Sequence, residues 1–341
     1  MGKLKAIQSH VARMPTASTA LAMVQKQPKQ LKRPKLEASD ALAKHDGLPH
    51  EREEQGGLRE RALLVRFSVG RWYGTGADEQ VTAQVKEDAG ATGDIGNFTK
   101  RFMSRDKLAQ INAITGEARK FYKTITLPWS DGGSRLLSAE AFFTFKSEML
   151  AFEGRFGTAV REFLERYPDF IDQERERLGK LFKQHDYPTV DQLRERFRFS
   201  LAIDALPNAD DFRVALGAEE VQRIRQDIEQ RVEHAVHEAS QSIWERMQEI
   251  VTGIKERLQD NVVRETLLQP LKELVQLMPA LNITNDPALT KLAEQAAQDL
   301  LAFDVDELRG KDAEPSRKLV ANKADAILKQ MSSFTGKKGG A

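Results

Sequence analysis

The sequence predicts a mainly α-helical protein with a small antiparallel β element in an α+β head, followed by a long helical C-terminal region. Long runs of apolar residues recur at three- and four-residue spacing, which is the period of an amphipathic helix. The few short stretches that alternate between apolar and polar residues, as half-buried strands do, all lie before residue 217. We therefore expect the strands in the first part of the chain and helices alone in the last part.

Length and composition set the expected division into domains. The chain has 341 residues, of which 40% are hydrophobic and 30% charged, and this suffices for about two ordinary domains. We expect a basic flexible arm and linker over 1–60, an α+β head domain over 61–217, a long-helix bundle or coiled-coil region over 218–333, and a flexible tail over 334–341. No run is apolar enough for a membrane span or a secretory signal, so we expect a cytoplasmic protein without a membrane partner.

The basic charge is concentrated at the start of the chain. Residues 1–36 hold eight basic side chains and no acidic one, although the whole chain has a net charge of only +1. Clustered Lys and Arg side chains bind nucleic-acid phosphates by releasing counterions, whatever the base sequence. The candidate contacts are Lys26, Lys29, Lys32, Arg33 and Lys35. The alternative interpretation is a solvated terminus without a ligand.

The first elements of the head follow from spacing and from proline. A strand is expected over 62–74, and a helix runs from Ser104 until Pro128 ends its pattern. Ser138 is expected to cap a further helix, and an aromatic stripe then continues at helical spacing to Tyr167, where Pro168 is expected to stop it. Stacking platforms for bases need basic residues beside exposed rings, so we interpret this stripe as core. A separate helix is expected over 169–184.

A second strand is expected near the end of the head. Thr189 and Gln192 have the spacing of a capping box, which predicts a short helix before the alternating segment 197–203. After a turn, segment 212–216 is expected to pair back on this strand as a hairpin that also joins the strand near Phe67. Arg194, Arg196 and Arg198 either form a basic face beside this hairpin or pair with neighbouring carboxylates such as Glu195.

Beyond Gly217 a single apolar stripe continues at a mean spacing close to an eleven-residue repeat, which predicts one long helix over 218–262. Such a stripe must be covered by other helices or by another copy of the chain, so its residues are the candidate oligomer or partner face: Ile224, Ile228, Val232, Ile243, Met247, Ile250, Ile254 and Leu258. Further helices are expected over 264–278, over 287–303 with Asp286 as cap, and over 315–332.

The sequence offers little catalytic chemistry. It has no cysteine, and it lacks the glycine-rich phosphate loops, nucleophile elbow and zinc-binding helix of common enzymes. His234 and His237 lie three residues apart on the long helix and suggest a metal site, but no third ligand is identifiable. A solvated helix face is the alternative. We predict no enzyme activity, no catalytic residue, no cofactor and no metal.

Four segments carry a resemblance to a known family: GRWYG at 70–74, TLPWSDGGSRLL at 126–137, LGKLFKQHDYP at 178–188 and DDFRV at 210–214. Over about 62–216 the chain resembles an uncharacterised family of phage and proteobacterial proteins, the domain of unknown function 3150. The resemblance implies a phage or prophage setting beside a MoxR-type AAA+ ATPase and a von Willebrand factor A protein. It implies no catalytic role for any residue.

Two functions are consistent with these observations. The first is a non-enzymatic interaction or adaptor protein that self-associates through its long helices, in a system driven by the AAA+ ATPase that the resemblance implies. The second is a phage nucleic-acid-binding protein, for single-stranded or nonspecific DNA, that contacts phosphates through its basic arm.

Overall fold

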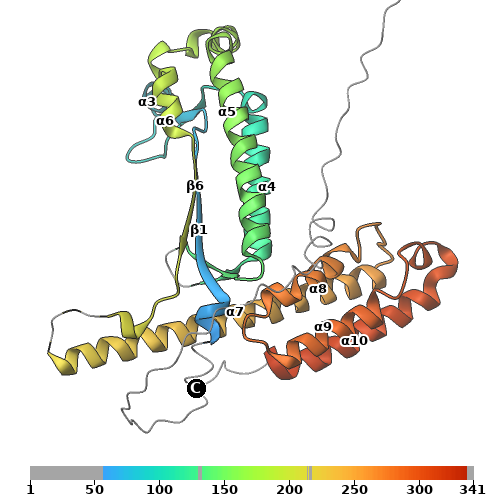
Figure 1. Ribbon diagram of the computed structural model, residues 1–341. Helices are drawn as coiled ribbons and strands as arrows, with labels where there is room; N and C mark the ends of the chain where they lie inside the picture. The colour runs from blue at the N-terminus through green and yellow to red at the C-terminus, as the bar shows by residue number, and fades with distance from the viewer. Residues whose placement is uncertain (1–56, 130–132, 213, 215–216, 336–341) are drawn as a thin grey trace, which may run out of the picture. The chain divides into compact units, whose positions relative to one another are not determined.

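The computed structural model describes residues 57–129, 133–212, 214 and 217–335 (Figure 1), apart from the side chains of 311 and 333–335. Within this part the chain forms two compact units. The first comprises 57–245 with 280–285, and the second comprises 246–279 with 286–335. The division falls inside the long helix, whereas the sequence places the boundary at its start.

Strands and helices are interspersed along the first unit before the long helix. In order they are β1 (Ala62–Gly70), β2 (Thr75–Ala77), α3 (Glu79–Asp88), β3 (Thr99–Arg101), α4 (Ala109–Ile125), β4 (Leu127–Pro128), β5 (Arg135–Ser138), α5 (Phe142–Leu178), α6 (Val190–Arg196) and β6 (Arg198–Asp204). Four strands form an antiparallel sheet in the order β4-β5-β1-β6, and β2 pairs with β3 in a second, two-stranded sheet.

The register of β1 and β6 follows from their alternating patterns. Phe67 is opposite Leu201, and Val69 is opposite Phe199, so these apolar side chains share one face of the sheet. The ring of Phe199 lies 5.7 Å from that of Phe156 on α5, which shows that this face packs on the helices. The prediction that the second strand joins the first near Phe67 is confirmed.

The described residues of segment 212–216 do not form the predicted hairpin with β6. The partner of β6 is β1, and the described residues Phe212 and Val214 belong to no strand. Residues 213, 215 and 216 lie outside the described residues.

Helix α5 is one continuous helix through Pro168, so the predicted stop at this residue and the separate helix after it are wrong. A proline inside a helix costs about 3 kcal/mol. Tyr167 and Phe170 are both buried against the core, and Glu174, one turn further on, accepts a hydrogen bond from the backbone N–H of Ser104. These contacts on both sides of the proline offset its cost.

The start of α5 also differs from expectation. Ser138 is the last residue of β5, and the N-cap of α5 is Ala141, which forms no side-chain cap. The Ser138 hydroxyl instead accepts a hydrogen bond from the backbone N–H of Glu140 at 3.2 Å. The short strands β4 and β5 were not predicted, because two and four residues are too few to show an alternating pattern.

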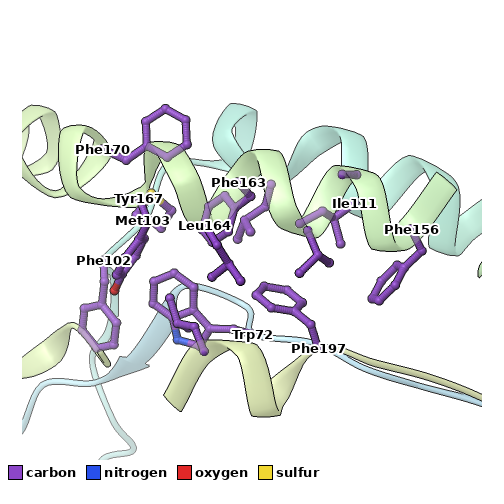
Figure 2. Packing of buried hydrophobic residues seen from close by; sticks show 14 of the residues in the cluster. Trp72, Phe102, Met103, Ile111, Phe156, Phe163, Leu164, Tyr167, Phe170 and Phe197 are labelled. Atoms are coloured by element: carbon purple, nitrogen blue, oxygen red, sulfur yellow. The ribbon is translucent and has the colours of Figure 1, made fainter. Parts of the chain in front are cut away.

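Aromatic side chains build the core of the head (Figure 2). The indole of Trp72 meets the ring of Tyr167 edge-on at 5.9 Å, and Phe163 lies 5.8 Å from Phe197, the residue between α6 and β6. The aromatic stripe of α5 is therefore core as predicted, with its members from Phe145 to Tyr167 buried or half-buried.

The long helix and those after it confirm the predicted helical C-terminal region. They are α7 (Ala218–Gln259), α8 (Gln269–Leu281), α9 (Pro287–Leu300) and α10 (Glu314–Thr335). Asp286 caps α9 by accepting a hydrogen bond from the backbone N–H of Ala288 at 2.8 Å, as expected.

In the second unit Lys323 of α10 pairs with Asp299 of α9 at 3.1 Å, and Lys255 pairs with Asp325 at 2.5 Å. Among the described helices, none is both long and apolar enough to cross a membrane.

Candidate functional site

The segments GRWYG and HDYP, which lie far apart in the sequence, meet in one pocket of the head. The pocket has a volume of about 430 Å³. Residues from the end of β1, from 185–188 and from α6 line it: Arg71, Trp72, Tyr73, Thr75, Phe102, His185, Asp186, Tyr187, Pro188, Gln192 and Arg196. A volume of this size suits a small molecule or one unit of a polymer.

The first segment ends at Gly74 in a left-handed backbone conformation, and the two aromatic residues before it differ in exposure. Gly74 has φ +63°, and a Cβ atom there would lie 2.6 Å from the Cβ of Met103, so no larger residue fits. Trp72 is 6% exposed and packs into the core (Figure 2), whereas Tyr73 is 59% exposed. The segment thus anchors itself by Trp72 and presents Tyr73 at the pocket.

Two tyrosine hydroxyls hold the second segment in place. Tyr187 donates a hydrogen bond to the backbone oxygen of Phe102 at 2.7 Å, and Tyr167 donates one to the backbone oxygen of Pro188 at 3.1 Å. Burial raises the pKa of Tyr187 to about 12 and raises that of Tyr167 further, so both phenols stay protonated as donors at neutral pH. The pocket wall formed by 185–188 is therefore fixed to the core.

A buried charge cluster lies behind this wall. The ammonium of Lys100 is 2.8 Å from the carboxylate of Asp78 and 2.6 Å from that of Asp186, and it donates to the backbone oxygen of Leu181 at 3.0 Å. Lys183 contributes a second ammonium, 3.0 Å from Asp78. The side chains of Lys100 and Asp78 are 3% and 1% exposed, so each depends on the other for its charge.

The pKa values of the cluster follow from these contacts. Hydrogen bonds from Lys100 and then Lys183 hold the pKa of Asp78 far below its usual range. Burial alone would lower the pKa of Lys100, but its hydrogen bonds to Asp186 and Asp78 outweigh burial and raise that pKa. Asp78 and Lys100 are therefore both charged at neutral pH.

Arg71 forms one polar wall of the pocket. One terminal nitrogen of its guanidinium donates a hydrogen bond to the side-chain oxygen of Asn112 on α4 at 2.8 Å, and the guanidinium lies 4.8 Å from the centre of the Tyr73 ring. A hydrogen bond from Arg71, its charge, and the more distant charge of Arg119 lower the pKa of the Tyr73 phenol. The Nε atom of Arg71 is buried and has no hydrogen-bond partner among the described residues.

The three arginines around α6 have different roles. Arg194 pairs with Asp191 at 2.7 Å, and Arg198 donates to the backbone oxygen of Glu195 at 2.9 Å. Arg196, the last residue of α6, is exposed, lines the pocket and forms no ion pair within the described part of the chain. Of the three arginines, Arg196 alone lines the pocket. The predicted basic face is therefore smaller than the three arginines suggested.

The candidate residues named from the sequence lie elsewhere. Lys26, Lys29, Lys32, Arg33 and Lys35 fall outside the described residues. Of the stripe along α7, five residues are buried within the single chain, and three are half-buried. The buried ones are Val232, Ile243, Met247, Ile254 and Leu258, and the half-buried ones are Ile224, Ile228 and Ile250.

The histidine pair on α7 is solvent-facing. The side chain of His234 is 73% exposed and lies 3.6 Å from Glu238, and His237 is also exposed. In the described part of the chain, no group of three or more His, Asp or Glu side chains is arranged to hold a metal ion. The arrangement agrees with the solvated helix face.

Sequence reasoning did not identify the pocket, because its arginines come from two distant segments. The signal available was the pair of segments GRWYG and HDYP, which were recognised only as features of a family resemblance.

Comparisons with protein-family models, with curated proteins and with solved structures find no match for this chain.

Proposed function

We propose that this protein is a non-enzymatic interaction protein whose head binds an anionic group of a partner in the pocket between β1 and α6. The observation that carries this proposal is the charge on the pocket wall. Arg71 and Arg196 both line the pocket, and the one carboxylate among the lining residues, Asp186, is already paired with Lys100. The lining therefore has an excess of positive charge, which favours a phosphate or carboxylate ligand.

The geometry of the wall supports a preformed site. Trp72 anchors the segment that carries Arg71, and the Asn112 side chain holds one of the guanidinium nitrogens. A guanidinium held in this way loses little conformational entropy on binding, so more of its interaction energy appears as affinity.

The wider role follows from the family resemblance. We infer a phage or prophage adaptor that works with a MoxR-type AAA+ ATPase and a von Willebrand factor A protein in the host cytoplasm. Self-association through the long helix is part of this proposal. Because most of the α7 stripe is buried within one chain, Ile224, Ile228 and Ile250 are the members that a second copy would contact first.

The alternative function is nucleic-acid binding by the basic arm with Lys26, Lys29, Lys32, Arg33 and Lys35. Its support is the accumulation of eight basic and no acidic side chains over 1–36. Substituting these five residues with Gln in the full chain tests this alternative. Binding of DNA through the arm should then weaken and depend less steeply on salt.

Calorimetric titration of the full chain with inorganic polyphosphate tests the leading proposal. We expect Arg196→Gln to weaken binding about tenfold or more, since a hydrogen bond to a charged group contributes about 1.5–3 kcal/mol. Arg194→Gln is the matched control, because Arg194 lies on the same helix but pairs with Asp191 and does not line the pocket. Equal affinities of the two variants would overturn the proposal.

A further inference from the structure

We propose that the ligand of the pocket is a single-stranded nucleic acid, with a base stacked on Tyr73 and a neighbouring phosphate on Arg71 and Arg196. This inference rests on the anion-binding role proposed above and adds the class of ligand. It uses the ring beside the arginines, whereas the basic arm plays no part in it.

The exposed ring is the first observation. Among the described Phe, Tyr and Trp residues, three are exposed: Tyr73, Phe98 and Phe143. Of these, only Tyr73 lines the pocket and carries a guanidinium over its ring, at 4.8 Å from the ring centre. An exposed ring interleaved with basic side chains is the arrangement of a base-stacking platform.

The placement of the arginines is the second observation. Arg71 lies against the ring of Tyr73, Arg119 on α4 is close enough to act on its phenol, and Arg196 stands on the α6 side of the same pocket. A base on the ring therefore places its phosphate in a pocket lined by Arg71 and Arg196.

The ring distinguishes a nucleic acid from an acidic peptide. A carboxylate on the arginines would leave the exposed face of Tyr73 without a partner, whereas every base has a planar face that stacks on it. The pocket volume of about 430 Å³ is in the range that holds one small molecule, which suits a single nucleotide unit.

The same argument selects a single strand over a duplex. In a duplex the faces of the bases are covered by their neighbours, and splaying one out requires unstacking and unpairing. The pocket binds the base face itself, so a strand whose bases are already free binds at lower cost. We therefore expect preference for single-stranded over double-stranded DNA of the same length and charge.

Fluorescence anisotropy with a labelled oligothymidylate and the full chain tests the inference. We expect Tyr73→Ser to weaken binding about fivefold or more, which corresponds to the loss of one stacked base. Tyr73→Phe keeps the ring and is expected to bind within about twofold of the unchanged protein. Arg196→Gln is expected to lower the affinity and to reduce its salt dependence, whereas Arg194→Gln changes neither.

Photocrosslinking adds a readout that folding defects do not imitate. With an iodouracil-substituted strand, mass spectrometry is expected to find the adduct on Tyr73 in the full chain, and unlabelled duplex should compete poorly for it. An adduct confined to 1–56, with Tyr73→Ser unchanged, would overturn the inference in favour of the basic arm.

The two proposals fail in different ways. If Arg196→Gln weakens polyphosphate binding but Tyr73→Ser leaves oligothymidylate binding unchanged, the anion site stands and the nucleic-acid assignment is overturned. If Arg196→Gln and Arg194→Gln behave alike toward polyphosphate, the anion site itself is overturned.

Discussion

The buried ammonium of Lys100 lies 2.6 Å from the carboxylate of Asp186, a residue that also lines the candidate pocket. This contact connects the buried charge cluster of the head with the net charge of the residues that line the pocket. Because Lys100 neutralises Asp186, the arginines on the same wall keep their positive charge available to a ligand.

Removing Lys100 is expected to destabilise the head strongly. In Lys100→Met the buried Asp78 loses its closest cation, and Asp186 loses its ion pair with Lys100. Removing one partner of a buried ion pair costs about 3–5 kcal/mol of unfolding free energy. Urea denaturation measures this change. Lys120→Met, at an exposed position on α4, is the control and should remain within about 0.5 kcal/mol of the unchanged protein.

The same cluster predicts how stability depends on pH. The pKa of Asp78 is lowered in the folded protein, so its stabilising effect is complete above the unfolded pKa of about 4 and is lost as the pH falls further. Asp78→Asn has no carboxylate to take up a proton as the pH falls, so its unfolding free energy should fall less steeply below about pH 4. Parallel curves for the two proteins from denaturation at several pH values would contradict this account.

The four tyrosines are expected to titrate separately. Burial raises the pKa values of Tyr122, Tyr167 and Tyr187, whereas Arg71 lowers that of Tyr73. Ultraviolet absorbance of tyrosinate should therefore show a single first phase below the usual value of about 10, and this phase should be absent in Tyr73→Phe. In Arg71→Gln the first phase should shift to higher pH, and an unchanged phase would show that Arg71 does not contact the ring.

The glycine of the GRWYG segment is expected to be irreplaceable. Gly74→Ala places a methyl group 2.6 Å from the Cβ of Met103 at a positive φ, so we expect a loss of about 2–4 kcal/mol of unfolding free energy. Gly154→Ala on α5 is the matched control, because its methyl group meets nothing within 4 Å. That variant should gain about 0.5–1 kcal/mol from helix propensity, and equal losses in both would refute the argument.

Proline in α5 provides a test of the fold itself. Pro168 is exposed in the middle of a continuous helix, so Pro168→Ala restores a backbone donor without disturbing the core. We expect the free energy of unfolding to rise by about 1–3 kcal/mol in thermal or urea denaturation. A decrease would mean that the helix breaks at this residue, as the sequence pattern alone suggested.

Particular elements show how much of the fold the sequence could reveal. Long periodic stripes identified α4, the first part of α5 and α7. The Asp286 cap identified α9, and the capping box of Thr189 and Gln192 identified α6. Local rules failed where distant packing decides the outcome. The burial of Tyr167 and Phe170 outweighs the proline between them, and the strands β2 to β5 are too short to show a period.

The candidate site was less accessible to sequence reasoning. Its basic groups are single arginines from two segments that only the tertiary fold brings together, while the nearby Arg194 and Arg198 are engaged elsewhere. A count of charges cannot separate Arg196 from these neighbours. The role of Asp186 also depends on Lys100, whose burial no local pattern indicates.

The most direct test of the central claim is arginine labelling with phenylglyoxal, with and without polyphosphate, read by mass spectrometry. If Arg71 and Arg196 form an anion site, polyphosphate should protect both from labelling and leave Arg194 and Arg198 unchanged. Protection of none of them, or equal protection of all four, would contradict the claim that this pocket binds an anionic group.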